Sequence, residues 1–114
     1  MSKEQLLKTI TGLGLSQVDA EVYIFLAKMG PQKGRNIADA LKLYKQQLYR
    51  SLRNLQRKGL ASATCERPAQ FSAVSLDKVI DMFVKVKSEE ARVLQETREE
   101  FLSAWRSIIR KEIS

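Results

Sequence analysis

The spacing of hydrophobic positions predicts two helices near the N-terminus. In residues 3–11 the apolar side chains fall on one helical face, at Leu6, Leu7 and Ile10. A second helix is expected from Ser16, whose hydroxyl suits an N-cap and which has Asp19 three residues later, as in a capping box. Its apolar positions recur at spacings of three and four, at Val18, Val22, Phe25, Leu26 and Met29. Gly30 and Pro31 end this helix.

The next segment predicts two more helices joined by a tight turn. A short helix is expected over residues 34–41, a turn at 42–43, and a longer helix over 44–58. One side of the longer helix carries Leu48, Leu52 and Leu55. The opposite side carries Gln46, Arg50, Arg53 and Arg57. This helix is therefore expected to bury its leucines and to expose its arginines.

Two short strands are expected after this helix. Residues 60–66 and 70–75 flank a turn at 67–69. Pro68 fits the tip of a hairpin, because proline inside a strand would remove a hydrogen bond from the ladder. The segment from residue 60 to residue 75 is therefore expected to form a small hairpin, or wing.

The last part of the chain has the pattern of one long helix. No glycine or proline occurs after Ser75, and a helix over 76–113 would be about 55 Å long at about 1.5 Å per residue. Its apolar stripe is longer than the preceding domain, so another chain or the first helix must cover it. We expect dimerisation through this stripe, at Ile80, Phe83, Leu94, Phe101, Trp105 and Ile108.

The order of these elements is that of a winged helix-turn-helix. The expected fold class is mainly α with a small β-hairpin wing (α+β), followed by a long C-terminal dimerisation helix. Two domains are expected, residues 1–75 and 76–114.

The net charge of the chain is concentrated in the helix-turn-helix and hairpin. Nine bases and two acids lie between Lys33 and Arg67, which gives +7, the formal net charge of the whole protein. Basic and acidic residues balance on either side of this segment. A basic surface localised in this way is typical of nucleic-acid binding. A solvated basic face without a partner is the alternative interpretation.

The exposed face of the 44–58 helix carries residue types that recognise DNA. Arginine and glutamine hydrogen-bond guanine and adenine edges in the major groove. The early turns of the helix supply the base-reading candidates Gln46, Gln47 and Arg50. Phosphate contacts are expected from Lys33, Arg35, Asn36, Lys45, Tyr49, Arg53, Arg57 and Arg67. Tyr49 has a second interpretation, in which it packs on the wing.

The composition offers little for enzyme chemistry. The chain has no histidine, and Cys65 is its only cysteine, so it cannot form an internal disulfide or a Cys/His or Ser/His nucleophile pair. We expect no enzyme activity, metal or cofactor, and no small-molecule effector is indicated. No apolar run approaches the ~20 residues that cross a bilayer, and the N-terminus does not resemble a secretory signal. A cytoplasmic protein without membrane contact is expected.

Two stretches of sequence resemble the TrmB family of transcription regulators. The string IADALKLYKQQLYRSLRNLQRKGLASA (37–63) is similar to the family's helix-turn-helix, and LGLSQVDAEVYIFLAKMGP (13–31) is similar to its opening. The match holds residue by residue at Tyr49, Leu52, Leu55, Lys58, Gly59 and Leu60. The resemblance implies a winged helix that binds operator DNA as a dimer, with the long helix pairing the subunits.

The sequence departs from the family pattern in two respects. Lys33 and Tyr44 stand where members often have serine or threonine N-caps, so these helix starts lack a side-chain cap worth about 1 kcal/mol each. Larger members also carry a C-terminal sugar-sensing domain, and nothing in this sequence supports sugar binding.

These observations favour a homodimeric transcription regulator that binds specific double-stranded DNA. The recognition helix, about 44–58, is expected in the major groove, and the wing, about 60–75, on the flank. One alternative is a winged-helix module that docks on a protein of the transcription machinery, because fold alone does not determine function. The other is a non-specific architectural DNA-binding protein.

Overall fold

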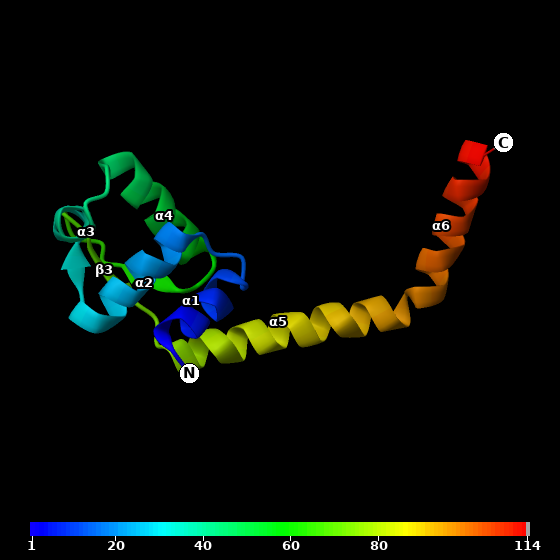
Figure 1. The fold of residues 1–114 in the computed structure, drawn as a ribbon, viewed down its shortest axis with the longest axis horizontal. Coiled ribbons are helices and arrows are strands. Elements are labelled where there is room, and N and C mark those ends of the chain that lie inside the picture. The colour runs from blue at the N-terminus through cyan, green and yellow to red at the C-terminus, as the bar shows by residue number, and fades with distance from the viewer. Residues whose placement is uncertain (114) are drawn as a thin grey trace. The chain divides into compact units, whose positions relative to one another are not determined.

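The computed structural model describes the backbone of residues 1–113 and the side chains of residues 1–111, and its contacts divide the chain into two units (Figure 1). The first unit ends at Val79 and the second begins at Ile80. The boundary expected from the sequence, after residue 75, lies close to this division. Ser114, with which the expected second domain ends, lies outside the described residues.

Four helices of the first unit match the predicted segments. They are α1 (Lys3–Thr11), α2 (Gln17–Met29), α3 (Gly34–Leu41) and α4 (Lys45–Arg57). The capping box at the start of α2 is confirmed, since Asp19 N donates to Ser16 Oγ at 3.0 Å and Ser16 N donates to Asp19 Oδ2 at 3.1 Å. Lys33 provides no side-chain cap for α3. At the start of α4, the side chain of Gln47 accepts from Tyr44 N at 3.3 Å.

A left-handed residue makes the turn between α3 and α4. Lys42 has φ 56° and ψ 48°, and its N–H and that of Leu43 both reach the carbonyl oxygen of Ala38. This is how a helix ends when its first non-helical residue adopts the αL conformation. Only three residues separate the end of α3 from the start of α4, and the two helices pack against each other as a helix-turn-helix (Figure 1).

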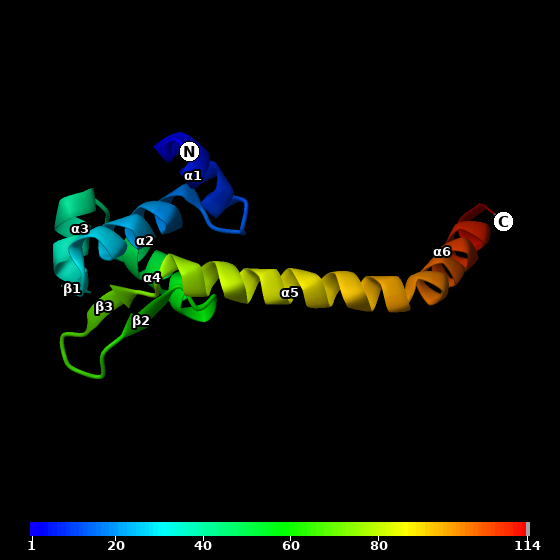
Figure 2. The same cartoon turned by 90° about the horizontal axis from the view of Figure 1, so that it is seen from below.

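The wing is part of a three-stranded antiparallel sheet with the order β1-β3-β2 (Figure 2). Its strands are β1 (Gln32–Lys33), β2 (Ala61–Ala63) and β3 (Gln70–Ala73). In β2 and β3, Ala61 pairs with Ala73 and Ala63 with Phe71. The expected strand over 60–66 is shorter, because the chain turns away after Thr64, whose hydroxyl accepts from Gln70 N. The sequence does not predict strand β1, because two residues are too few to show the alternation of apolar and polar side chains that indicates a strand.

The core of the first unit lies between α2, α4 and the sheet. Its fully buried side chains are Val22, Leu26, Ile37, Leu48, Leu52, Leu55, Leu60 and Val79. The predicted leucine face of α4 is therefore confirmed. On α2 the apolar pattern includes Met29, but this side chain is 55% exposed. Tyr23, which lies outside that pattern, is buried, and its hydroxyl donates to Val74 O at 2.6 Å.

The single long helix expected after Ser75 is wrong in detail, because α5 (Leu76–Glu96) and α6 (Arg98–Ile113) are separate helices. The break lies at Thr97, whose hydroxyl donates to Val93 O at 2.8 Å. When a threonine hydroxyl donates to the carbonyl oxygen four residues earlier in the chain, the helix often bends there. Such a bend requires neither glycine nor proline. The fold is mainly helical with a small antiparallel sheet, which confirms the expected fold class.

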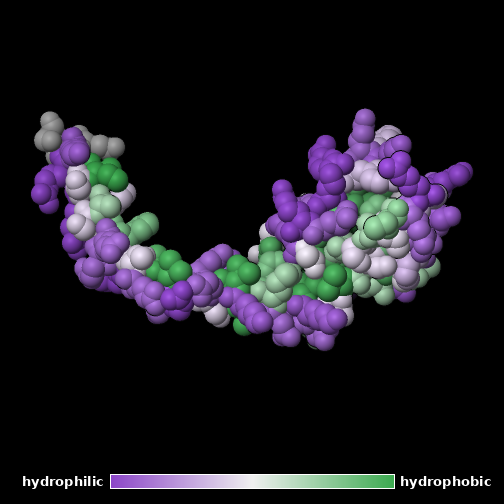
Figure 3. Space-filling view, turned by 180° about the vertical axis from the view of Figure 1, so that it is seen from behind, coloured by the Kyte–Doolittle hydropathy of each residue, from purple (hydrophilic) through white to green (hydrophobic). Residues whose placement is uncertain are grey.

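Large apolar side chains are exposed along the second unit. Figure 3 shows apolar surface between polar patches on these helices. The exposed residues are Ile80, Val84, Val86, Val93, Leu94, Phe101, Trp105 and Ile108. Phe83, also expected at a dimer interface, is half-buried.

Candidate nucleic-acid interface

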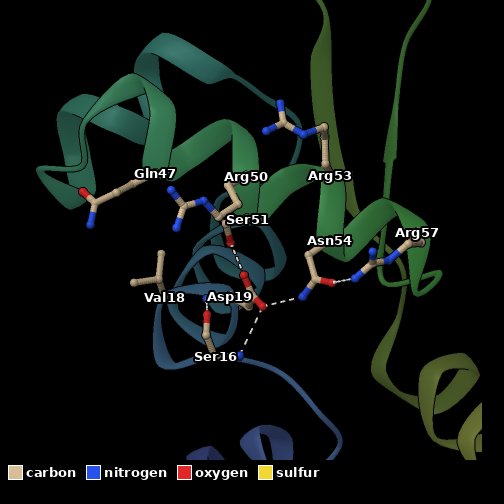
Figure 4. A pocket seen from close by; sticks show the side chains of 9 residues that line it. All are labelled: Ser16, Val18, Asp19, Gln47, Arg50, Ser51, Arg53, Asn54 and Arg57. Atoms are coloured by element: carbon tan, nitrogen blue, oxygen red, sulfur yellow. Dashed lines mark hydrogen bonds between the residues drawn. The ribbon is translucent and has the colours of Figure 1, made fainter.

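Helix α4 has three sides of different character. Its leucines are buried in the core, and Arg50, Arg53 and Arg57 are exposed on the opposite side. Ser51 and Asn54 lie between these two sides, where α4 packs against α2 (Figure 4). The core packing of the leucines therefore fixes which side chains α4 presents to solvent.

An open groove of about 720 Å³ runs between the start of α2 and the outer side of α4 (Figure 4). Its lining consists of Ser16, Val18, Asp19, Gln47, Arg50, Ser51, Arg53, Asn54 and Arg57. Three arginines thus meet in one concave surface, together with one carboxylate. Such a surface suits an anionic ligand that is long enough to follow the helix.

A hydrogen-bond network at the floor of the groove joins α2 to α4. Asp19 is 5% exposed, and its carboxylate accepts from Ser51 Oγ and Asn54 Nδ2, both at 2.6 Å. Asn54 in turn accepts from Arg57 Nη2 at 2.5 Å (Figure 4). The network therefore extends from a buried acid to an exposed arginine.

The hydrogen bonds keep Asp19 ionised. Burial alone would raise the pKa of this carboxyl, but the bonds from Ser51, the Ser16 backbone and Asn54 outweigh burial and lower it below 3.8. Among the described side chains, no buried polar atom lacks a hydrogen-bond partner. The negative charge thus lies beneath the arginines without an unsatisfied group.

The structure gathers only part of the predicted DNA-binding set into the groove. Gln47 lines it, although its side chain also caps α4. Gln46 and Lys45 are exposed on the first turns of α4, outside the groove lining.

The other predicted residues lie at the start of α3 and in the wing. Lys33, Arg35 and Asn36 are exposed around the N-terminus of α3, where Asn36 Nδ2 donates to Gln32 Oε1 at 3.4 Å. Arg67 is exposed in the loop between β2 and β3 (Figure 2). Lys33, Arg35 and Arg67 are thus accessible cations, and they lie in β1, in α3 and in the loop of the wing.

Tyr49 packs on the wing. Its ring meets that of Phe71 edge to face, with the centroids 6.2 Å apart and the planes at 74°. The ring also covers Gly34 at the start of α3, where an added Cβ would lie 2.5 Å from the tyrosine hydroxyl oxygen. The packing interpretation of Tyr49 therefore holds, and a phosphate contact by its hydroxyl remains a prediction.

Sequence reasoning missed the network that supports α4. The sequence pattern predicts only a capping role for Asp19 and indicates no role for Ser51 or Asn54. A signal was present, because Ser51 falls three residues after Leu48 and directly before Leu52, at a spacing otherwise occupied by core residues. A polar residue at a core position requires a buried partner.

The described residues contain no group of three or more cysteine or acidic side chains arranged to hold a metal ion. Within the same part of the chain, no helix has the length and hydropathy to span a membrane.

Comparisons with known proteins identify the family. The family model described as "Sugar-specific transcriptional regulator TrmB" matches residues 10–77. TrmBL2, described as an archaeal chromatin protein with a novel mode of DNA binding, aligns with 100% of this chain at 19% identity and a TM-score of 0.81. This chain covers 44% of the length of TrmBL2. No curated protein matches the sequence significantly.

Two further structures share the fold. A possible transcriptional regulator from Methanosarcina mazei aligns at 19% identity and a TM-score of 0.63, over 86% of this chain and 88% of that one. The Zalpha domain of PKZ from Carassius auratus, solved with Z-DNA, aligns at 28% identity and a TM-score of 0.50, over 51% of this chain and 94% of that one. With more than half of its length matched by the family model, the chain belongs to the TrmB family of winged-helix, DNA-binding transcription regulators.

Proposed function

We propose that this protein is a homodimeric regulator that binds specific double-stranded DNA with α4 in the major groove. The observation that carries the proposal is the exposed side of α4, where Gln46, Arg50, Arg53 and Arg57 lie opposite the buried leucines. A major groove is wide enough for one helix, and these side chains match its donor and acceptor pattern. The function is binding, without enzyme activity or a cofactor, in the cytoplasm.

Individual side chains have different roles in this proposal. Gln46, Gln47 and Arg50, on the early turns of α4, contact base edges. Arg53 and Arg57 contact phosphates, which fix the position of the protein without reading sequence. Lys33, Arg35, Asn36, Lys45 and the Tyr49 hydroxyl add backbone contacts, and Arg67 reaches the flank through the wing.

The dimer in this proposal forms through the second unit. Among its described side chains none is buried, and Phe101 and Trp105 are 65% and 56% exposed. Covering this surface with a second copy removes apolar area from water. Two recognition helices then enter successive major grooves about 34 Å apart, so the binding site is a pseudo-palindrome.

Affinity measurements on two arginine variants test the specific mode of binding. Arg50→Ala should cost ~1–3 kcal/mol on a selected site and much less on scrambled duplex, because it removes a base contact. Arg57→Ala should weaken both complexes alike. Affinities for both duplexes are measured at one fixed salt concentration, because phosphate contacts make binding salt-dependent.

Two other outcomes favour the alternatives. If Arg50→Ala weakens both complexes by the same factor, a non-specific architectural role replaces specific regulation. TrmBL2, described as a chromatin protein, shows that this fold occurs in such a protein. If neither variant changes DNA affinity, α4 serves to dock a protein instead.

A further inference from the structure

Asn54 is the one side chain of α4 that hydrogen-bonds both a buried acid and an exposed arginine within the groove. Its Nδ2 donates to Asp19 Oδ2 at 2.6 Å, and its Oδ1 accepts from Arg57 Nη2 at 2.5 Å (Figure 4). Asn54 is half-buried, whereas Arg57 is exposed. The amide therefore connects the rigid α2–α4 contact with a side chain that faces solvent.

The charge of Asp19 fixes the direction of this amide. An ionised carboxylate only accepts hydrogen bonds, so Asn54 must turn its NH₂ group toward Asp19. The carbonyl oxygen then points the other way, where it is the acceptor that a guanidinium requires. A neutral partner in place of Asp19 would allow the amide to flip, and the NH₂ group would then face the positive charge of Arg57.

Ordering of Arg57 before DNA arrives has an energetic consequence. A free arginine samples many rotamers and loses that freedom when it contacts a phosphate. An arginine already held by Asn54 loses less, because part of the ordering has occurred on folding.

We propose that Asn54, itself held by Asp19, is a positioning residue that fixes the guanidinium of Arg57 for contact with a DNA phosphate. The inference rests on the proposed phosphate role of Arg57 and adds that this role depends on the network beneath it. Asn54 need not contact DNA itself.

A double-mutant cycle on the full chain tests the proposal. Affinity for a mixed-sequence duplex is measured for the wild type, Asn54→Ala, Arg57→Ala and the double variant, at one salt concentration. Asn54→Ala should weaken binding roughly two- to tenfold, the range set by freeing one long side chain. In the Arg57→Ala background the same change should have no further effect, because the side chain that it positions is absent.

Two matched controls separate positioning from general loss of structure. Ser51→Ala also removes one donor from Asp19, at 2.6 Å, but keeps the hydrogen bond between Asn54 and Arg57. It should therefore lower the melting temperature without the loss of DNA affinity. In a second cycle, Asn54→Ala and Arg53→Ala should act additively.

The outcomes distinguish the two levels of the proposal. If Arg57→Ala leaves DNA affinity unchanged, its phosphate role is wrong and the positioning role falls with it. If Arg57→Ala weakens binding but Asn54→Ala costs the same factor in both backgrounds, or Ser51→Ala costs as much as Asn54→Ala, only the positioning role is wrong.

Discussion

Among single residues, Asp19 combines a buried charge with donors from three residues. The Ser51 hydroxyl, the Asn54 amide and the Ser16 backbone all donate to its carboxylate. Burial of a charge is unfavourable unless such bonds replace its hydration. Because Ser51 and Asn54 belong to α4, the bonds that stabilise the charge also hold α4 against α2.

Asp19 should make stability depend on pH in the acid range. Its folded-state pKa lies below the ordinary value of 3.8, so the stability that it contributes is complete above that value and is lost as the pH falls through the folded-state pKa. Asp19→Asn should lower the free energy of unfolding at neutral pH by roughly 1–3 kcal/mol and flatten its dependence on pH below about 4. Urea unfolding at a series of pH values measures both effects.

The exposed acid Asp39 supplies a control for this experiment. Asp39→Asn should leave both the stability and its pH dependence close to those of the wild type. Equal pH profiles for the wild type and Asp19→Asn would show that Asp19 is not held as an ion.

Gly34 is required by the side chain that covers it. An added Cβ would lie 2.5 Å from the Tyr49 hydroxyl oxygen and 3.1 Å from its Cζ, so the ring that packs on Phe71 must shift. Gly34→Ala should therefore destabilise the protein by about 1–3 kcal/mol, although alanine has the better helix propensity. Tyr49→Phe removes the nearest atom, and in that background the cost should be smaller. Thermal unfolding measures the cost of Gly34→Ala in the wild type and in Tyr49→Phe. If the two costs are equal, the destabilisation arises from the backbone at residue 34 and not from the Tyr49 hydroxyl.

Among the elements, those with a strong local pattern were predictable and those without one were not. The leucine face of α4 specifies its length and its buried side, because the pattern repeats over several turns. Strand β1 has two residues and exists only because Gln32 and Lys33 meet Phe71 and Gln70 of β3. At the break between α5 and α6, the Thr97 hydroxyl donates to the carbonyl oxygen of Val93. The spacing of apolar and polar residues does not indicate such a bond.

At the scale of the wing, one cation is expected to contribute to DNA affinity without affecting specificity. Arg67 is exposed in the loop between β2 and β3. Arg67→Ala should weaken binding about equally for all sequences, and the slope of log affinity against log salt should fall by ~1. Titrations at several salt concentrations, on selected and scrambled duplexes, measure this slope. An unchanged slope with an altered base preference would instead indicate that Arg67 reads the minor groove.

At the scale of the whole molecule, the two units differ in how their apolar side chains are covered. The first unit surrounds its leucines with helices and a sheet. In the second, none of the described side chains is buried, and Phe101, Trp105 and Ile108 lie on one side of α6. Apolar surface of this extent is typical of an interaction site.

Self-association should therefore depend on α6. Phe101→Glu with Trp105→Glu places two charges in the apolar stripe and should convert a dimer to a monomer in light scattering. Ser103→Glu, on the opposite side of the same helix, adds a charge without entering the stripe and should remain dimeric. A dimer that survives the double substitution would direct attention to α1, around Leu6, Leu7 and Ile10.

The helix-turn-helix, the wing and the side of α4 that carries the arginines could all be predicted from the sequence. These features follow from local periodicity, turn residues and charge, each of which lies within a few neighbouring positions. The contacts of Asp19 with Ser51 and Asn54, which lie 32 and 35 residues away in the sequence, became visible only in the folded protein. The same holds for the hydrogen bond from Tyr23 to Val74, 51 residues away, and for the packing of Tyr49 over Gly34. Such contacts arise only when distant segments pack together, and no local pattern encodes which polar side chains will then face each other.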